Sequence, residues 1–174
     1  QHTNRPANNR PALFYALQAA SVVAEMATRK RVEVIHAASN HVNALPALLA
    51  ARQLGIPFQY EMRGLWELTR ISRQPDFEGL QAYRQGLQLE GLVARSADRL
   101  FVISQQLGRY AQDHWNVAAG RMALLPNCVD PDRIVPADPQ RVQPYTIGYA
   151  GSLITYEGLD TLIDRLIDSV RAWY

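Results

Sequence analysis

The sequence predicts an α/β fold in which a mostly parallel sheet carries helices on both faces. Short β-branched runs alternate with longer segments of helical periodicity, and this helix–strand pair occurs four times in succession. Parallel strands need such crossover segments between them. The 174 residues are 48% hydrophobic and 20% charged, a composition typical of a domain with a packed core and not of a disordered chain.

Each helix start has a recognisable local signal. Proline favours the first turn of a helix, and Ser or Asn favours the cap position before it. The residues that we expect to open the four helices are Pro11, Asn43 with Pro46 in the first turn, Pro75 and Ser104. Gly55 is expected to end the second helix. The four expected strands are residues 32–35, 56–60, 100–103 and 122–125, with a polar loop over 63–74.

The alternation of expected helices and strands stops after the fourth strand. Five of the ten prolines fall between Pro126 and Pro144, which indicates a linker or domain boundary. Beyond it, residues 146–150 are expected to form a strand and residues 159–167 an amphipathic helix. One strand and one helix do not make a domain, so we expect a second domain to begin here and to be cut off.

Composition excludes several kinds of function. A formal net charge of +2 argues against a nucleic-acid binder with a broad basic face. The single Cys128 excludes an internal disulfide or a multi-cysteine metal site and is expected to be a small packing residue. No apolar run approaches the ~20 residues that a membrane span needs. No sequence pattern for a metal site is present, and none is expected.

Two segments are candidates for ligand binding. Gly148 to Ser152 follows the expected strand and leads towards a helix, so its glycines could admit a phosphate to backbone N–H groups, although an ordinary tight turn fits as well. The loop from Glu61 to Glu67 follows the carboxyl end of a strand, where α/β sheets bind ligands. Arg63 could hold a phosphate or carboxylate there, Trp66 could stack on a sugar and Glu67 could accept hydrogen bonds from hydroxyls; an Arg–Glu surface pair beside a packed Trp is the alternative.

The strand before this loop ends at His36, followed by Ser39 and Asn40, and should open on the same edge of the sheet. His36 could contact a ligand or could be a hydrogen-bonded structural histidine.

Taken together, these segments resemble the glycosyltransferase group 1 superfamily, the retaining GT-B enzymes usually classed as family four. The resemblance extends from about Val32 to the end of the chain. Its carriers are the strings Val34-Ile-His-Ala-Ala-Ser39, Pro46-Ala-Leu-Leu-Ala-Ala51, Leu54-Gly-Ile-Pro57, Tyr60-Glu-Met-Arg-Gly-Leu-Trp-Glu67, Ala97-Asp98, Leu125-Pro-Asn-Cys-Val-Asp130, Gly148-Tyr-Ala-Gly-Ser-Leu153 and Tyr156-Glu-Gly-Leu-Asp160. The Arg-Gly-x-Trp-Glu loop and the last string look most like the branch associated with bacterial exopolysaccharide synthesis.

The resemblance implies two Rossmann-like domains facing a cleft. Residues 1–125 would be the later part of the N-terminal, acceptor-side domain, residues 126–144 the interdomain linker, and residues 145–174 the first strand and helix of the donor-binding domain. The implied activity is transfer of a hexose from a nucleotide-sugar donor to a glycan or lipid-linked acceptor, without a cofactor, a metal or nucleic acid. A cytoplasmic parent protein, with peripheral membrane association left open, is expected, and this piece alone should not turn over substrate.

Family motifs also assign residues to roles. Arg63 and Gly64 stand where many relatives have His-Gly facing the sugar, so Arg63 is the catalytic candidate; His36, Ser39, Asn40, Trp66 and Glu67 are the substrate-binding candidates with Gly64. Gly151 and Ser152 match the loop under the donor diphosphate. Relatives commonly have Arg after that glycine and Lys a few residues later, whereas Ser152 and Glu157 stand here.

Ser152 and Glu157 leave open a rival class, a non-catalytic Rossmann-like regulatory or assembly module. A dinucleotide-dependent enzyme is a third reading, weakened by the absence of a GxGxxG motif.

Overall fold

The computed structural model describes residues 12–141, 143–154 and 157–171. Pro11 and Tyr156, which figured in the sequence predictions, lie outside this part. The helices are α1 (Ala12–Lys30), α2 (His41–Leu54), α3 (Trp66–Ile71), α4 (Gln81–Ser96), α5 (Gln105–Trp115) and α6 (Leu159–Arg171). The strands are β1 (Ile35–Ser39), β2 (Phe58–Met62), β3 (Arg99–Val102) and β4 (Met122–Leu124). Short 3-10 helices, η1 (Pro75–Gly79), η2 (Ala119–Arg121) and η3 (Pro139–Arg141), complete the elements of this part of the chain.

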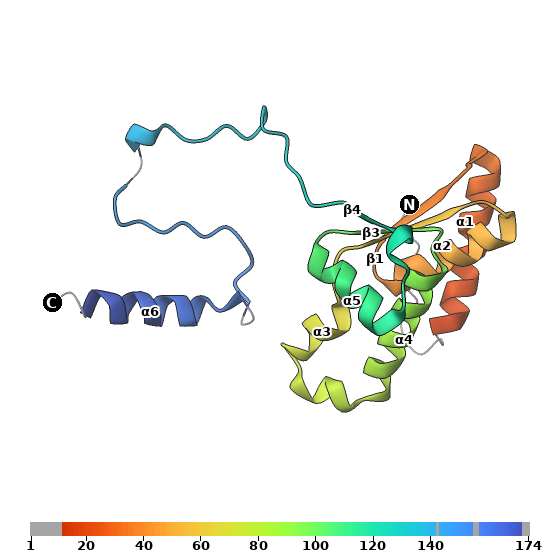
Figure 1. Cartoon of the computed structure of the whole chain (residues 1–174), viewed down its shortest axis with the longest axis horizontal. Coiled ribbons are helices and arrows are strands. Elements are labelled where there is room, and N and C mark those ends of the chain that lie inside the picture. The colour runs from red at the N-terminus through yellow and green to blue at the C-terminus, as the bar shows by residue number, and fades with distance from the viewer. Residues whose placement is uncertain (1–11, 142, 155–156, 172–174) are drawn as a thin grey trace.

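The predicted α/β class is confirmed: four parallel strands form one sheet in the order β1-β2-β3-β4. The order never reverses among these strands. Because crossovers between parallel strands are right-handed, a sheet that grows in one direction places its connecting helices on one face. Figure 1 shows the helices of this body gathered on one side of the sheet. The expectation of helices on both faces is therefore wrong for the described strands.

The side-chain pattern of the strands agrees with this one-sided arrangement. One face carries the core residues Phe58, Tyr60, Met62 and Leu100, each fully buried against the helices. The opposite face carries His36, Gln59, Glu61, Arg99 and Phe101, which are exposed or half-buried. Alternation of buried and polar residues is the pattern of a sheet with one solvated face. We call this second face the open face.

The first strand lies further along the chain than predicted. Residues 32–34 are outside the sheet, because Arg31 adopts φ 53° and the N–H of Val32 bonds to the carbonyl of Ala27, which closes α1. The strand begins at Ile35, and it ends at Ser39 instead of residue 35. His36 therefore lies near the start of β1, and Ser39 and Asn40 take the place at its carboxyl end.

The helix predictions are confirmed with changes at the boundaries. Asn40, not Asn43, is the cap of α2, because its carbonyl accepts the N–H groups of Asn43 and Ala44. Gly55 ends α2 at φ 66°, where glycine carries no steric cost. Ser104 caps α5, accepting the N–H of Leu107 at 3.2 Å. Pro75 opens the 3-10 helix η1 instead of α4, and the predicted loop over 63–74 contains α3.

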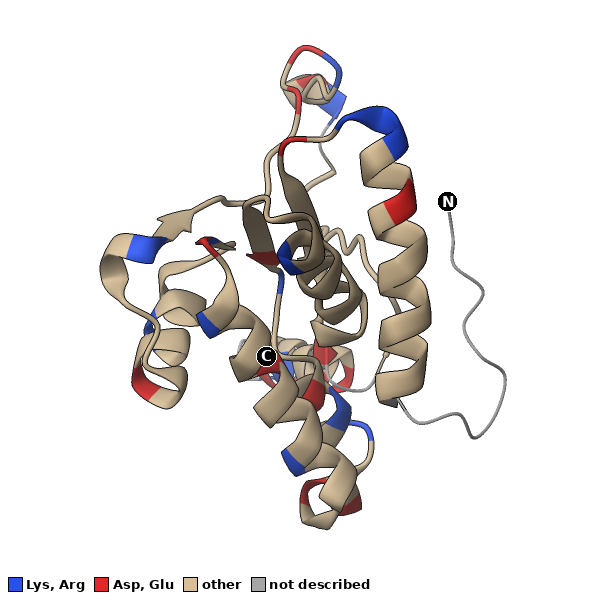
Figure 2. Ribbon diagram, turned by 90° about the vertical axis from the view of Figure 1, so that its right-hand side faces the viewer, with Lys and Arg blue, Asp and Glu red and all other residues tan. Residues whose placement is uncertain are grey.

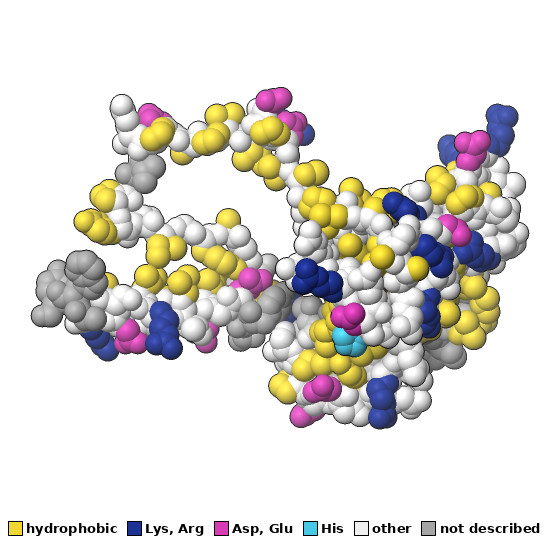
Figure 3. All heavy atoms as spheres, viewed as in Figure 1, with side chains coloured by type: hydrophobic (Ala, Val, Ile, Leu, Met, Phe, Trp, Pro, Cys, Tyr) yellow, Lys and Arg dark blue, Asp and Glu magenta, His cyan; other side chains and the backbone are white. Residues whose placement is uncertain are grey.

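The end of the chain differs most from the prediction. Residues 146–150 form no strand, and Cys128, expected to pack, is exposed. The amphipathic helix is present as α6, with its apolar residues Leu162, Ile163 and Leu166 partly exposed. Figure 3 shows hydrophobic side chains on one side of this helix and charged ones on the other.

Asp98, part of the Ala97-Asp98 string, joins the amino ends of β2 and β3. Its carboxylate accepts the N–H of Phe58 at 2.8 Å and a guanidinium N–H of Arg52 at 3.0 Å, and its own N–H donates to the carbonyl of Phe58 at 2.8 Å. The hydrogen bond from Arg52, followed by that from Phe58, lowers the pKa of Asp98. Asp98 is therefore a structural residue of the sheet.

We expect Asp98→Ala to lower the free energy of unfolding by about 1–2 kcal/mol at pH 7, because the N–H of Phe58 loses its acceptor. A carboxyl whose folded pKa is lowered stabilises above its unfolded pKa, about 3.9, and this contribution is lost as the pH falls through the folded pKa. Urea unfolding at pH 7 and pH 3 should thus show a difference between variant and wild type that shrinks in acid. An equal difference at both pH values would contradict the assignment.

Candidate functional site

The carboxyl ends of β1 and β2 are the first place to look for a site, since ligands of open parallel sheets bind at that edge. β1 ends at Ser39, which has φ 98° although it is not glycine. Such a conformation is strained and persists only where surrounding contacts determine it; it is common at functional sites. The turn from Ser39 to His41 leads directly into α2.

Beside this turn lies a group of buried polar residues from four elements. We call Asn40, His41, Tyr60, Glu67 and Glu90 the edge cluster. Asn40 is 6% exposed, Glu67 8%, Glu90 1% and Tyr60 fully buried. Buried polar groups are costly unless they are hydrogen-bonded, so their partners define how the cluster is built.

Glu90, on α4, is at the centre of the edge cluster. One carboxylate oxygen accepts the hydroxyl of Tyr60, and the other accepts the backbone N–H of His41 at 2.7 Å. His41 Nδ1 lies 3.3 Å from that second oxygen and 3.6 Å from a carboxylate oxygen of Glu67. The imidazole thus stands between two carboxylates, and it connects the β1–α2 turn with α3.

Glu67 is held in place by close packing. Burial raises the pKa of its carboxyl. A Cβ built at Gly86 on α4 would stand 2.3 Å from a Glu67 carboxylate oxygen and 2.7 Å from Glu67 Cγ, so only glycine leaves room for this side chain. Glu67 therefore lies between α3 and α4, pointing into the cluster and not towards solvent.

Two oxygen atoms of the edge cluster lack a partner. Among the described residues, the buried side-chain atoms without a hydrogen bond are Asn40 Oδ1 and the second carboxylate oxygen of Glu67. Both residues were substrate-binding candidates from sequence. An unpaired buried acceptor is costly, and a donor from a ligand could reach these two atoms only if the side chains around them moved.

A second group lies on the open face of the sheet. His36 contacts Gln59 Oε1 at 3.3 Å through Nδ1 and a Glu61 carboxylate oxygen at 3.1 Å through Nε2. Arg63 Nε donates to the other oxygen of Glu61 at 2.7 Å. The hydrogen bond from Arg63 is the main cause that lowers the pKa of Glu61; burial opposes it, and the hydrogen bond from His36 adds a smaller lowering effect. We call His36, Glu61 and Arg63 the open-face row.

The structure thus divides the candidates predicted around the first two strands. His36 and Arg63 meet through Glu61 on the open face, whereas Asn40 and Glu67 meet on the covered side, beside the turn at Ser39. Arg63 forms an ion pair with Glu61, so the Arg–Glu pair of the alternative interpretation is present, although Trp66 beside it is exposed and not packed. Trp66 is 52% exposed and Gly64 has open space around it, so both are accessible at the start of α3.

The hydrogen bonds of the donor-loop candidates lie within their own stretch of the chain. Gly151, Ser152 and Glu157 are exposed and lie in a stretch without a strand. The Tyr149 hydroxyl donates to the Ser152 carbonyl at 2.9 Å, and the N–H of Glu157 bonds to the carbonyl of Ile154. The predicted strand-to-helix turn is therefore not formed as such, because no strand precedes it and α6 begins only at Leu159.

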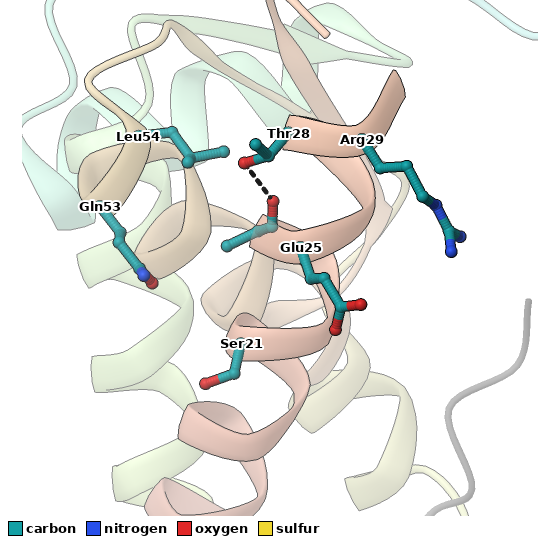
Figure 4. A pocket seen from close by; sticks show the side chains of 7 residues that line it. Ser21, Glu25, Thr28, Arg29, Gln53 and Leu54 are labelled. Carbon is teal, nitrogen blue, oxygen red and sulfur yellow. Dashed lines mark hydrogen bonds between the residues drawn. The ribbon is translucent and has the colours of Figure 1, made fainter. Parts of the chain in front are cut away.

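A separate hollow lies between α1 and α2. It has a volume of about 440 Å³ and is lined by Ser21, Ala24, Glu25, Thr28, Arg29, Gln53 and Leu54. Thr28 Oγ1 donates to the carbonyl of Ala24 at 2.9 Å, the bond drawn in Figure 4. The carboxyl ends of α1 and α2 meet the amino ends of β1 and β2, so this hollow is at the edge where parallel sheets do not usually bind ligands.

Comparison with known proteins decides the family. The family model described as the Glycosyl transferase 4-like domain matches residues 2–128. The chain belongs to this glycosyltransferase family. The match includes β1 to β4, the edge cluster and the open-face row, whereas residues 151–157 lie beyond it.

One solved structure is similar to part of the chain. The crystal structure of a glycosyltransferase from Rickettsia africae ESF-5 is 16% identical over 82% of this chain, with a TM-score of 0.49. The chain covers 33% of the length of that protein. The comparison with curated proteins gives no match.

Two further findings concern the part of the chain that the structure describes. Within the residues that the structure describes, no group of three or more His, Cys, Asp or Glu is arranged to hold a metal ion. Over the same residues, no helix has the length and apolar character to cross a membrane. Figure 2 shows basic segments interspersed with acidic ones along the ribbon.

His41, Tyr60, Glu61 and Glu90 are site residues that the sequence did not suggest. A signal for Glu90 was available: it stands three residues after Leu87 and three before Val93, on the apolar stripe of its helix. A carboxylate on an inward-facing stripe must have buried partners. No such pattern distinguished Tyr60, which occurs within an apolar strand.

Proposed function

We propose that this chain is part of a retaining GT-B glycosyltransferase that transfers a hexose from a nucleotide-diphosphate sugar to a glycan or lipid-linked acceptor. The observation that carries the proposal is the family match over residues 2–128, which contains both groups of polar residues. The strings around Arg63 and Gly151 favour the exopolysaccharide-associated branch. Such an enzyme would work in the cytoplasm, and a lipid-linked acceptor would bring it to the membrane surface.

The proposal divides the chain into parts with different tasks. Residues 1–125 would belong to the acceptor-side domain, and residues 145–174 would form the beginning of the donor-binding domain. Residues 126–144 would be the linker between the two domains. The exposed apolar side of α6 supports this division, because an amphipathic helix buries that side against a partner. Gly151, Ser152 and Glu157 would then face the donor diphosphate.

The edge cluster suits the acceptor. Its two unpaired acceptor atoms, on Asn40 and Glu67, are buried, so a sugar hydroxyl would reach them only after the neighbouring side chains move. Ser39, half-buried at the end of β1, and the exposed Trp66 stand beside it, and the indole face can pack on a sugar ring. These residues would orient the acceptor hydroxyl that attacks the donor.

Arg63 is suited to stabilise the negative charge that develops during sugar transfer. The Arg63 side chain is exposed, and one hydrogen bond from its Nε to Glu61 fixes it. The terminal N–H groups of the guanidinium would then bind the donor diphosphate or an oxygen next to the oxocarbenium carbon of the sugar. A fixed cation aimed at developing negative charge stabilises the transition state. Glu61, held in turn by His36, would orient Arg63.

We expect Arg63→Ala to lower kcat/KM for sugar transfer about 100-fold in the longer protein that contains this chain, a typical cost of removing one transition-state donor. Release of nucleoside diphosphate from UDP-sugars and GDP-sugars measures this. Arg99→Ala is the matched control, since Arg99 is an exposed arginine on the same face whose guanidinium donates to the carbonyl of Gly120 at 3.0 Å. Equal activity of Arg63→Ala and Arg99→Ala would remove Arg63 from the site.

Calorimetric titration of the wild-type protein tests the proposal itself. Heat on addition of one of these nucleotide sugars is expected. No heat with any of them, from a folded protein, would favour the non-catalytic module instead.

A further inference from the structure

Helix α2 is capped in an unusual way. Asn40 occupies its cap position, but the Asn40 side chain makes no capping hydrogen bond. The first free backbone N–H, that of His41, is instead bound at 2.7 Å by the carboxylate of Glu90, which lies 49 residues later in the chain. A negative group at this position is stabilised by the helix dipole as well as by the hydrogen bond.

The same carboxylate also holds the strand end on the other side of the turn. Its second oxygen accepts the hydroxyl of Tyr60, and that hydroxyl lies 3.3 Å from the carbonyl of Ser39. Burial, reinforced by the charge of Glu90, raises the pKa of Tyr60, so the phenol remains a donor at neutral pH. Glu90 therefore holds His41 directly, and its hydrogen bond with Tyr60 places the phenol against the Ser39 carbonyl, 3.3 Å away.

This arrangement explains how Ser39 keeps its strained backbone. A φ of 98° in a serine persists only when neighbouring contacts determine it. Glu90 is 1% exposed and cannot touch a substrate, whereas Ser39 is half-buried at the ligand-binding edge. Glu90 would act through the turn and not on the reacting groups.

The charges indicate what kind of ligand this edge accepts. The N-terminus of a helix commonly binds phosphate, but the N-terminus of α2 already holds a carboxylate, and Glu67 lies next to it. Two buried glutamates at this edge would repel an anion, whereas an uncharged hydroxyl group would not be repelled.

We propose that Glu90, with Tyr60, is the positioning residue that holds the turn from Ser39 to His41 in the shape that receives the uncharged, hydroxyl-bearing part of the acceptor. This inference rests on the proposed function for its ligand, and on the contacts of Glu90 for its mechanism. The diphosphate is bound elsewhere.

The first test measures amide hydrogen exchange of the 174-residue chain. Tyr60→Phe removes one donor to Glu90 and leaves the side chain nearly isosteric, and Glu90→Gln replaces the charged acceptor by a weaker neutral one. Both should speed exchange at His41 by about tenfold or more, which corresponds to loss of one net hydrogen bond of that strength. Asp98→Ala, which loses a hydrogen bond at the amino edge of the sheet, should leave exchange at His41 unchanged. Unchanged exchange at His41 in both Tyr60→Phe and Glu90→Gln would overturn the proposal.

The second test separates positioning from general stability. In the longer protein, Tyr60→Phe should raise the KM for the acceptor about tenfold and leave the KM for the nucleotide sugar unchanged, whereas Asp98→Ala should change neither. Equal KM values for the acceptor in Tyr60→Phe and Asp98→Ala would also overturn the proposal that Glu90 and Tyr60 position the turn. A wild-type protein that transfers no sugar would contradict the proposed function, while exchange at His41 would still decide whether Glu90 holds the turn.

Discussion

Glu90→Ala should destabilise the chain by about 3–5 kcal/mol, a large share of the stability of an ordinary domain. The variant leaves the partly buried N–H of His41 without its acceptor and leaves the buried hydroxyl of Tyr60 with only the Ser39 carbonyl, 3.3 Å away. Each unpaired buried donor costs about 1–3 kcal/mol, and the space left by the side chain adds to this. Urea unfolding followed by circular dichroism would show the effect as a lower midpoint with a similar slope.

The matched control is Glu25→Ala, which removes an exposed glutamate from the middle of another helix. Surface substitutions of this kind change stability by about 0.5 kcal/mol or less. If Glu90→Ala unfolded at the same urea concentration as Glu25→Ala, the buried carboxylate would not have the structural role described for it.

Gly91→Ala should destabilise the packing of α4 against α5 by about 1–2 kcal/mol. A Cβ at this position would stand 2.6–2.9 Å from three atoms of the Trp115 indole. Trp115 is 6% exposed and packs edge-to-face on Tyr110, with ring centroids 5.2 Å apart, so the ring cannot turn aside freely. Overpacking lowers the free energy of unfolding by about 1–3 kcal/mol, whereas the better helix propensity of alanine raises it by up to about 1 kcal/mol.

Gly79→Ala provides the comparison, because a Cβ there has open space around it. Thermal unfolding of the two variants should place Gly91→Ala several degrees below wild type and Gly79→Ala near it. A Gly91→Ala variant as stable as wild type would mean that Trp115 has another rotamer available at little cost.

The fold was predictable where local signals and burial agree. Ser104 and Gly55 carry cap chemistry that depends on neighbouring residues only, and both occupy the cap positions expected from sequence. The first strand was predicted too early because Val32 and Val34 have strand propensity, whereas closure of α1 by the N–H of Val32 keeps them out of the sheet. The periodicity of apolar residues indicates which residues could be buried, whereas tertiary contacts determine which residues are buried.

The candidate site was predictable in part for a similar reason. Asn40 and Glu67 could be selected because they follow strand ends. Glu61, Tyr60 and Glu90 take their roles from side chains on other elements, separated by up to 49 residues, and no local pattern contains that information. The division between a covered side and an open face also depends on the strand order, which the sequence alone does not display.

The exposed connection between β4 and α6 has a practical consequence. Arg133 and Arg141 lie there in residues without strand or α-helix, and both are exposed, which makes the connection a substrate for trypsin. Brief digestion should release the segment with α6 from the body that holds the sheet. The two pieces can then be purified apart and studied separately.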